Sequence, residues 1–139
     1  MILIDTSGLL SAIDASQRHH DRCAAVLGSA QPPLLLSPFV LAELDYLLGK
    51  HIGIAAQTAF LAEVARGAYQ LERFDATDVA AALAFLERHA DLRIGLADAS
   101  IAVLAERHGV RDVLTLDERH FRVLRAGPRR RFRILPADA

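Results

Sequence analysis

The chain begins with Met1-Ile2-Leu3-Ile4-Asp5-Thr6-Ser7, in which a short apolar run passes directly into polar residues. Leu9, Leu10 and Ile13 follow at a helical spacing. The pattern therefore predicts a strand over residues 2–4 and a helix after it. Three consecutive apolar residues leave no polar face, which is typical of a strand covered on both sides.

The same order of elements recurs further along the chain. Leu34-Leu35-Leu36 leads into Ser37-Pro38, an N-cap followed by proline at the first helical position, and into a helix that we expect to end before Gly49. Val113-Leu114-Thr115-Leu116 is a further strand-like run, with a helix predicted over residues 117–124.

The remaining patterns complete an α/β domain. Residues 69–74 and 132–135 are predicted to be strands, and Gly28 is expected to close the first of four further helices, at 16–27, 54–66, 77–89 and 97–108. Short apolar strands separated by helices favour a parallel sheet covered on both faces. We therefore predict three layers with a four- to five-stranded parallel sheet, in a single domain over residues 1–139, because 139 residues is the usual size of one domain.

Composition excludes several classes of protein. With 53% hydrophobic and 24% charged residues the chain is too apolar for intrinsic disorder. Its one cysteine, Cys23, excludes a disulfide framework and favours a reducing environment. No apolar run approaches the ~20 residues that span a bilayer, and the N-terminus lacks the features of a signal peptide, so a cytoplasmic protein without a membrane partner is predicted.

Acidic residues stand where a ligand site is expected. In parallel sheets that site lies beyond the carboxyl ends of the strands, where Asp5 and Asp117 follow predicted strands. Either of them, taken alone, is more simply a helix N-cap. Asp98, in the first turn of the predicted helix 97–108, shares a stripe with Ile101 and Ala102 and faces the edge of the core. N-capping and metal binding both fit that position.

The predicted helix after Pro38 carries two further acids, Glu43 and Asp45. This helix is apolar on most sides, so a carboxylate within it is expected to be buried and to need compensation. Periodicity does not choose between the two residues. If these acids converge, a hard cation such as Mg²⁺ or Mn²⁺ would offset their repulsion and support phosphoryl chemistry.

Four segments resemble, in order and spacing, the motifs of the PIN domain, and within that family those of the VapC toxins of bacterial toxin–antitoxin pairs. The resemblance covers essentially the whole chain. The segments are Met1-Ile2-Leu3-Ile4-Asp5-Thr6-Ser7, Leu41-Ala42-Glu43-Leu44, Leu96-Ala97-Asp98-Ala99-Ser100-Ile101-Ala102 and Leu114-Thr115-Leu116-Asp117-Glu118-Arg119-His120-Phe121.

The resemblance implies a Rossmann-like fold and an endoribonuclease that hydrolyses RNA phosphodiester bonds by metal-activated water. It also implies a homodimer and a cognate VapB-like antitoxin whose peptide lies over the site. Thr6 and Thr115 match hydroxyl positions that support the site, and Asp45 falls outside it. The implied catalytic and metal-binding residues, with Mg²⁺ (or Mn²⁺) as the cofactor, are Asp5, Glu43, Asp98 and Asp117.

An alternative function is that of a catalytically silent PIN-like module that binds RNA or protein. The arginines Arg129, Arg130 and Arg131 are candidate RNA contacts, because the guanidinium group binds phosphate well, although the same residues suit a docking face for a protein partner. The pair His19 and His20 has no partner at metal-ligand spacing, and Cys23 suits the core, so these three residues receive no functional role.

Overall fold

The computed structural model describes all residues from Met1 to Ala139. Its sheet has five parallel strands in the order β3-β2-β1-β4-β7. The predicted parallel α/β architecture is therefore confirmed, with β1 at the centre between β2 and β4. The strands are β1 (Ile2–Ile4), β2 (Leu34–Leu36), β3 (Gln70–Leu71), β4 (Asp112–Leu114) and β7 (Arg133–Leu135).

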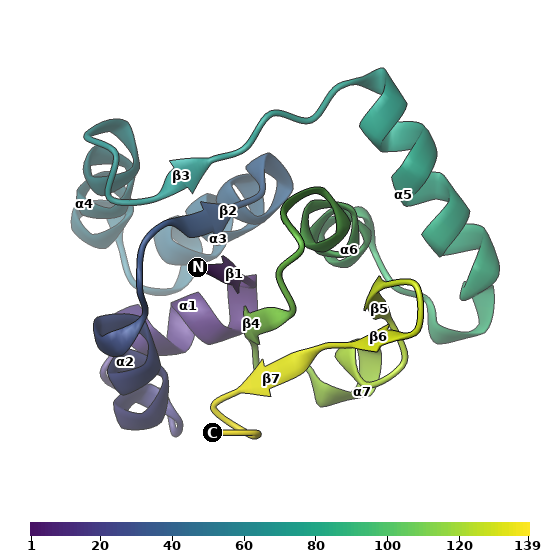
Figure 1. The fold of residues 1–139 in the computed structure, drawn as a ribbon. Coiled ribbons are helices and arrows are strands. Elements are labelled where there is room, and N and C mark those ends of the chain that lie inside the picture. Colours follow the sequence, from purple (N-terminus) through teal and green to yellow (C-terminus); the bar gives the residue numbers. More distant parts are fainter.

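Helices cover the sheet on both sides. Figure 1 shows α1 and α2 on one side of the central strands β1 and β4, and α6 on the other, with α5 packed against α6. None of these helices has the length and apolar character needed to cross a bilayer. The helices are α1 (Thr6–Ile13), α2 (His20–Ser29), α3 (Pro38–His51), α4 (Ile54–Ala65), α5 (Ala76–Arg88), α6 (Leu96–His108) and α7 (Glu118–Phe121), with a 3₁₀ turn η1 (Ala90–Leu92) before α6.

The core explains why these elements form. All three residues of β1 are buried, as the absence of a polar face predicts. Helix α6 is buried on every side from Ala99 to Ala105, because it lies between the sheet and α5. Asp98 stands directly before this buried run and is thereby held at the edge of the core.

Helix α1 lies directly on the backbone of β4 at Gly8. A Cβ atom at this position would lie 2.5 Å from the carbonyl oxygen of Leu114, closer than real Cβ contacts allow. The backbone N–H of Asp5 donates to the same oxygen at 3.0 Å. Only glycine therefore permits this approach, which places the end of β1 beside the end of β4.

Several predicted boundaries were wrong. Gly28 and Gly49 lie inside α2 and α3 rather than after them, because one glycine in a last turn costs only about 1 kcal/mol and packing outweighs it. The helix predicted over residues 117–124 is confined to α7. An antiparallel hairpin, β5 (Arg125–Gly127) with β6 (Arg130–Arg131), was not predicted, because its arginine-rich sequence has no apolar alternation.

Candidate active site

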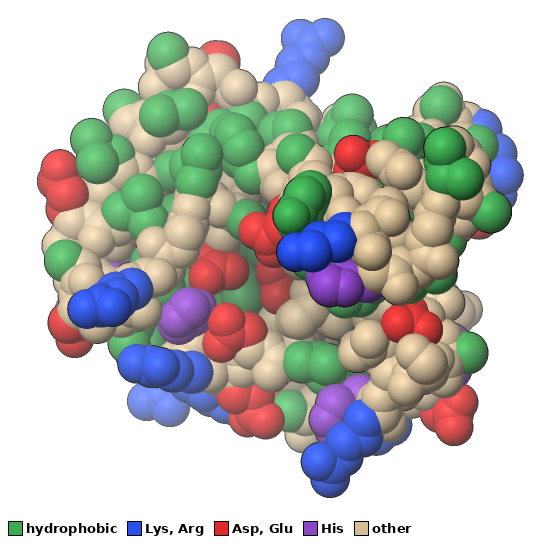
Figure 2. All heavy atoms as spheres, turned by 180° about the vertical axis from the view of Figure 1, so that it is seen from behind, with side chains coloured by type: hydrophobic (Ala, Val, Ile, Leu, Met, Phe, Trp, Pro, Cys, Tyr) green, Lys and Arg blue, Asp and Glu red, His purple; other side chains and the backbone are tan.

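Four acids meet at the carboxyl ends of β1 and β4. They come from the β1–α1 junction, from α3, from the first turn of α6 and from the β4–α7 junction. Figure 2 shows acidic side chains grouped in a hollow near the centre of this face of the molecule. The hollow is a cleft of about 550 Å³, whose lining includes Asp5, Glu43, Asp98 and Asp117.

Asp5 is buried and held by two hydroxyl groups. Its Oδ2 accepts hydrogen bonds from Thr115 Oγ1 at 2.6 Å and from Ser7 Oγ at 2.9 Å. Although Asp5 occupies the N-cap position of α1, its side chain makes no capping hydrogen bond. The N-cap interpretation of Asp5 was therefore wrong, and its carboxylate is oriented by Ser7 and Thr115 instead.

The two hydroxyl groups join the ends of β1 and β4. Ser7 Oγ accepts from the backbone N–H of Leu116 at 2.9 Å, and Thr115 Oγ1 accepts from that of Asp117 at 2.9 Å. The sequence interpretation gave Ser7 no role. Its position two residues after Asp5, in a polar junction that follows an apolar strand, was the available signal.

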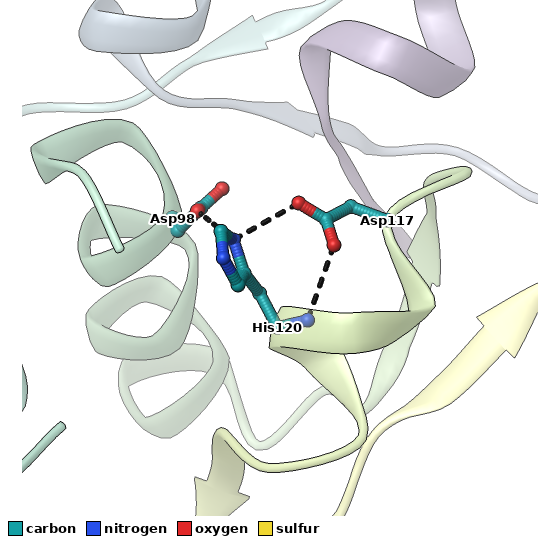
Figure 3. A group of neighbouring side chains, drawn as sticks. All are labelled: Asp98, Asp117 and His120. Carbon is teal, nitrogen blue, oxygen red and sulfur yellow. Dashed lines mark hydrogen bonds and ion pairs between the residues drawn. The ribbon is translucent and has the colours of Figure 1, made fainter. Parts of the chain in front are cut away.

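Asp98 and Asp117 are linked through His120, as Figure 3 shows. His120 Nδ1 lies 2.9 Å from Asp98 Oδ2 and 2.9 Å from Asp117 Oδ2. Asp117 caps α7, since its Oδ1 accepts from the backbone N–H of His120 at 3.1 Å. Asp98 caps nothing, because Gly95 is the N-cap of α6. Sequence reasoning gave His120 no role.

The structure separates Glu43 from Asp45. Helix α3 buries the stripe of Val40, Leu44 and Leu48, and the side chain of Glu43 lies beside this stripe, exposed and facing the cleft. The expected burial of Glu43 was therefore wrong. Asp45 lies outside the cleft, where its Oδ1 accepts from Gln57 Nε2 of α4 at 2.8 Å.

Two acids of the cleft, Asp98 and Asp5, have raised pKa values, chiefly because they are buried. Burial, followed by the nearby charge of Asp5, raises the pKa of Asp98 to about 6, against the opposing hydrogen bond with His120. Burial also raises the pKa of Asp5, despite its hydrogen bonds with Thr115 and Ser7. Crowded carboxylates of this kind are stabilised by a cation.

A second observation points to a ligand in the cleft. The Oγ1 atom of Thr6, a buried residue that lines the cleft, has no hydrogen-bond partner. Buried hydroxyl groups are normally paired, because an unpaired one costs about 1–3 kcal/mol. Carboxylate and hydroxyl oxygens with one imidazole are compatible with a divalent metal site.

The predicted arginine cluster lies away from the cleft. Arg130 lies near Gly109, which ends α6 at the opposite end of the helix from Asp98. No lysine or arginine lines the cleft itself. Cys23 is fully buried, and His20 Nδ1 lies 2.9 Å from the carbonyl oxygen of Ser11, so both residues make structural contacts.

Comparison with known proteins identifies the family. Residues 2–126 match the model of the PIN domain, and the chain therefore belongs to the PIN domain family. It is 41% identical over 135 residues to Ribonuclease VapC26 of Mycobacterium tuberculosis, a match that covers 97% of this chain and 100% of that protein. The predicted resemblance to the PIN domain and the VapC proteins is confirmed.

A solved structure shares the fold. The crystal structure of Mycobacterium tuberculosis VapC20, described as a sarcin–ricin loop cleaving toxin, superposes with a TM-score of 0.80. The match covers 86% of this chain and 92% of VapC20, at 23% sequence identity. At this identity the likeness supports the fold alone.

Proposed function

We propose that this protein is a divalent-metal-dependent endoribonuclease, acting as the toxin of a toxin–antitoxin pair. The observation that carries the proposal is the convergence of four acids from four separate segments on one cleft of a PIN domain. Ribonuclease VapC26, which is 41% identical over nearly the full length, is named as a ribonuclease, and this supports RNA as the substrate. The bond hydrolysed is the RNA phosphodiester.

Asp5, Glu43, Asp98 and Asp117 would hold Mg²⁺ (or Mn²⁺). The absence of lysine and arginine from the cleft lining leaves these charges without a strong cationic partner, and Thr6 offers a further oxygen. When bound, such an ion would stabilise developing charge on the phosphate and make a water molecule more acidic and so more readily activated for attack.

The protein's own residues prepare the site. Ser7 and Thr115 hold the carboxylate of Asp5 in one orientation, and the hydrogen bond to the start of α7 holds Asp117. Fixed orientation of this kind lowers the entropic cost of bringing the reacting groups together. The cleft wall also carries Leu10 and Phe39, apolar surfaces suited to the sugars and bases of an RNA strand.

A matched pair of variants on α3 tests this assignment. Glu43→Gln should reduce Mg²⁺-dependent cleavage of single-stranded RNA by about 100-fold, the upper range of losses when a metal site is disturbed. Asp45→Asn should cleave like wild type, because Asp45 lies outside the cleft and pairs with Gln57. Equal losses in the two variants would contradict the assignment of Glu43. RNA binding without cleavage by wild type, with either ion, would favour the silent binding module.

Exposed apolar side chains on α3 and α4 support the proposal that the protein binds protein partners. Tyr46, Ile54 and Leu61 are 61%, 75% and 38% exposed. Side chains of this size are typical of interfaces, which suits a homodimer and a VapB-like antitoxin. Expression of the protein in the cytoplasm should arrest growth, and co-expression of its cognate antitoxin should restore growth. Sedimentation of the purified chain tests the dimer.

The arginines of the β5–β6 hairpin are proposed to contact RNA beyond the cleft. Replacement of Arg129, Arg130 and Arg131 by Gln should weaken the binding of long RNA and lower the slope of log K against log salt by about 0.7 for each phosphate group that is no longer bound. Cleavage of a short oligonucleotide should persist, because these residues lie away from the acids. An unchanged slope with loss of antitoxin binding would assign the cluster to the protein partner.

A further inference from the structure

His120 occupies a position that the acidic motifs do not account for. Its Nδ1 atom, Asp98 and Asp117 each offer one ligand atom, and these atoms all lie within 4.8 Å of one another. Figure 3 shows the imidazole pointing from α7 towards the two carboxylates. The group therefore combines one nitrogen donor with two oxygen donors, and the two carboxylates line the cleft.

The imidazole is held in place by the packing of α7. Phe121, the next residue, is 1% exposed and packs edge to face on Phe132 with ring centroids 5.3 Å apart. The backbone N–H of His120 is fixed by the side chain of Asp117. The packing of Phe121 and the hydrogen bond to Asp117 therefore fix the helix that carries His120. This suits the side chain to be a metal ligand, because metal sites require preorganised donors.

We propose that His120 is a nitrogen ligand to the divalent ion held by Asp98 and Asp117, and that this mixed site binds Mn²⁺ in preference to Mg²⁺. The inference rests on the proposed function. It adds a residue and a metal preference that the four acids alone do not supply, since oxygen ligands by themselves accept either ion.

The separations and the donor types both support this assignment. Neighbouring ligands of a six-coordinate ion at about 2.1 Å lie roughly 3 Å apart. The two distances of 2.9 Å from His120 Nδ1 to the carboxylates are close to that separation. Imidazole nitrogen suits transition metals, whereas Mg²⁺ favours oxygen and keeps its water. The nitrogen therefore favours Mn²⁺ more than Mg²⁺.

Pulsed electron paramagnetic resonance of the Mn²⁺-loaded protein tests the ligand directly, because a coordinated imidazole produces nitrogen modulation of the Mn²⁺ echo. Wild type should show this modulation. His120→Asn should lose it, although the Asn amide can occupy the place of Nδ1 and keep hydrogen bonds to the carboxylates. His51→Asn, at an exposed histidine that ends α3, is the matched control and should keep the signal.

Calorimetric titration of the same three proteins measures the preference. Wild type and His51→Asn should bind Mn²⁺ more tightly than Mg²⁺. In His120→Asn the Mn²⁺ affinity should fall by at least about tenfold, as expected when a metal site loses a supporting group. The Mg²⁺ affinity should change by less than about twofold, because its oxygen ligands remain.

Bound Mn²⁺ without nitrogen modulation in wild type would overturn the proposal, as would an unchanged ratio of affinities in a folded His120→Asn variant. The wild-type spectrum decides the question even if the variant fails to fold. RNA cleavage that persists alongside either negative result would leave the proposed function standing. A wild type that neither binds divalent ions nor cleaves RNA would overturn both.

Discussion

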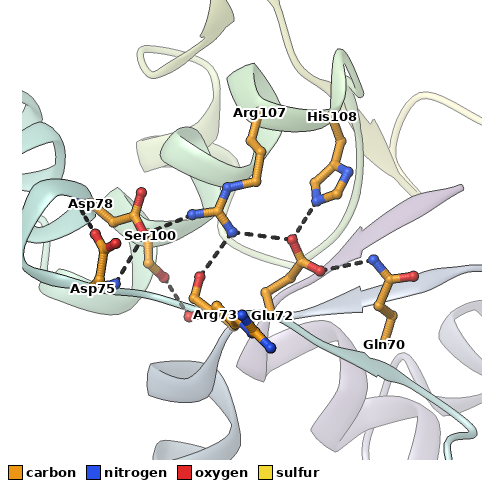
Figure 4. A network of polar contacts seen from close by, with 9 residues as sticks. Gln70, Glu72, Arg73, Asp75, Asp78, Ser100, Arg107 and His108 are labelled. Carbon is orange, nitrogen blue, oxygen red and sulfur yellow. Dashed lines mark hydrogen bonds and ion pairs between the residues drawn. The ribbon is translucent and has the colours of Figure 1, made fainter.

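Two groups of acids in this molecule have opposite surroundings. In the cleft, carboxylates face one another. Near the C-terminal end of α6, the side chain of Glu72 is 7% exposed and lies among donors: Arg107 Nη1 at 3.3 Å, Gln70 Nε2 at 2.9 Å and the imidazole of His108. Arg107 also reaches Asp78 of α5 at 2.8 Å. We call this network the Glu72 clasp (Figure 4).

The two regions differ in the direction of their pKa shifts. Burial acts to raise the pKa of Glu72, but hydrogen bonds from Gln70, His108 and Arg107, with the charge of His108, together hold it below its ordinary value. The pKa of Asp98 is raised to about 6 by burial and by Asp5. Burial alone therefore does not mark a functional acid. The distinguishing property is that Asp98 is buried beside another acid, without enough positive charge to offset it. Such an acid indicates a candidate ligand-binding site.

The largest expected effect is that of Asp98→Asn. Cleavage should fall by about 100-fold. Wild type in Mg²⁺ or Mn²⁺ at about 100 times Kd should gain about 2.7 kcal/mol of stability, and the variant should lose most of this gain. With chelator the variant should be at least as stable as wild type, because repulsion is relieved. Asp98→Ala should carry no cap penalty, since Gly95 is the N-cap.

Melting curves of these three proteins, with chelator and with excess metal, provide the measurement. An equal metal-induced rise in wild type and Asp98→Asn would remove Asp98 from the metal site. If Asp98→Asn melts well below wild type in the presence of chelator, the charge of Asp98 is compensated in the same way as that of Glu72.

The next effect is a pH dependence of the metal-free protein. As pH rises from about 4 to about 6, unfolded Asp98 releases its proton while the folded residue, with its raised pKa, retains it. Stability is therefore highest at the acidic end of this window and falls by on the order of 2 kcal/mol across it. Urea midpoints with chelator measure the slope. Subtracting the pH profile of Asp98→Asn from that of wild type isolates the contribution of Asp98 to stability. If the two profiles have the same slope, the prediction is contradicted.

Neutralising Glu72 should lower the stability of the protein, whereas neutralising Asp98 should not lower the stability of the metal-free protein. Glu72→Gln should destabilise the protein by about 1–2 kcal/mol, because it weakens charge-assisted hydrogen bonds from Arg107 and His108. Metal-dependent cleavage should stay within about twofold of wild type, because no residue of the clasp lines the cleft. Urea unfolding and an RNA cleavage assay provide the two measurements. A gain in stability would show that the contrast between the two regions is false.

The smallest effect is expected at Thr6. Thr6→Val removes the unpaired buried hydroxyl and should stabilise the metal-free protein by about 1 kcal/mol. The matched change Thr115→Val should destabilise it by a similar amount, because Thr115 donates to Asp5 and accepts from the backbone of Asp117. Thermal melting of the two variants compares them directly. Loss of stability in Thr6→Val would mean that its hydroxyl group is paired.

The sequence predicted the fold well because its strands are short apolar runs without a polar face. Ile2–Ile4 and Leu34–Leu36 were placed at their observed bounds, and the parallel arrangement followed from the intervening helices. Asp5 and Asp117 could be nominated for the same reason, since the end of a strand determines where its next residue lies. The position of Asp98 in the first turn of α6 was likewise predicted from the helix pattern.

What the sequence could not provide was the set of contacts between distant segments. Periodicity alone does not distinguish Glu43 from Asp45, because both have apolar neighbours on α3. The family resemblance selected Glu43, and in the structure Glu43 lines the cleft while Asp45 pairs with Gln57 of α4. His120 is one of six histidines, and its meeting with Asp98 depends on where α7 lies relative to α6. The capping roles depend on backbone geometry: Asp117 caps its helix and Asp5 does not.

The close approach of Gly8 to the backbone of β4 bears on how such proteins can diverge. Main-chain atoms, rather than interchangeable side chains, set the spacing between the segments that carry Asp5 and Thr115. Leu10, Phe39 and Leu47, which form the walls of the cleft, take no part in this spacing. Substitutions in the walls can therefore change what the cleft admits while the acidic floor keeps a constant spacing, so that walls and floor can vary independently on one scaffold.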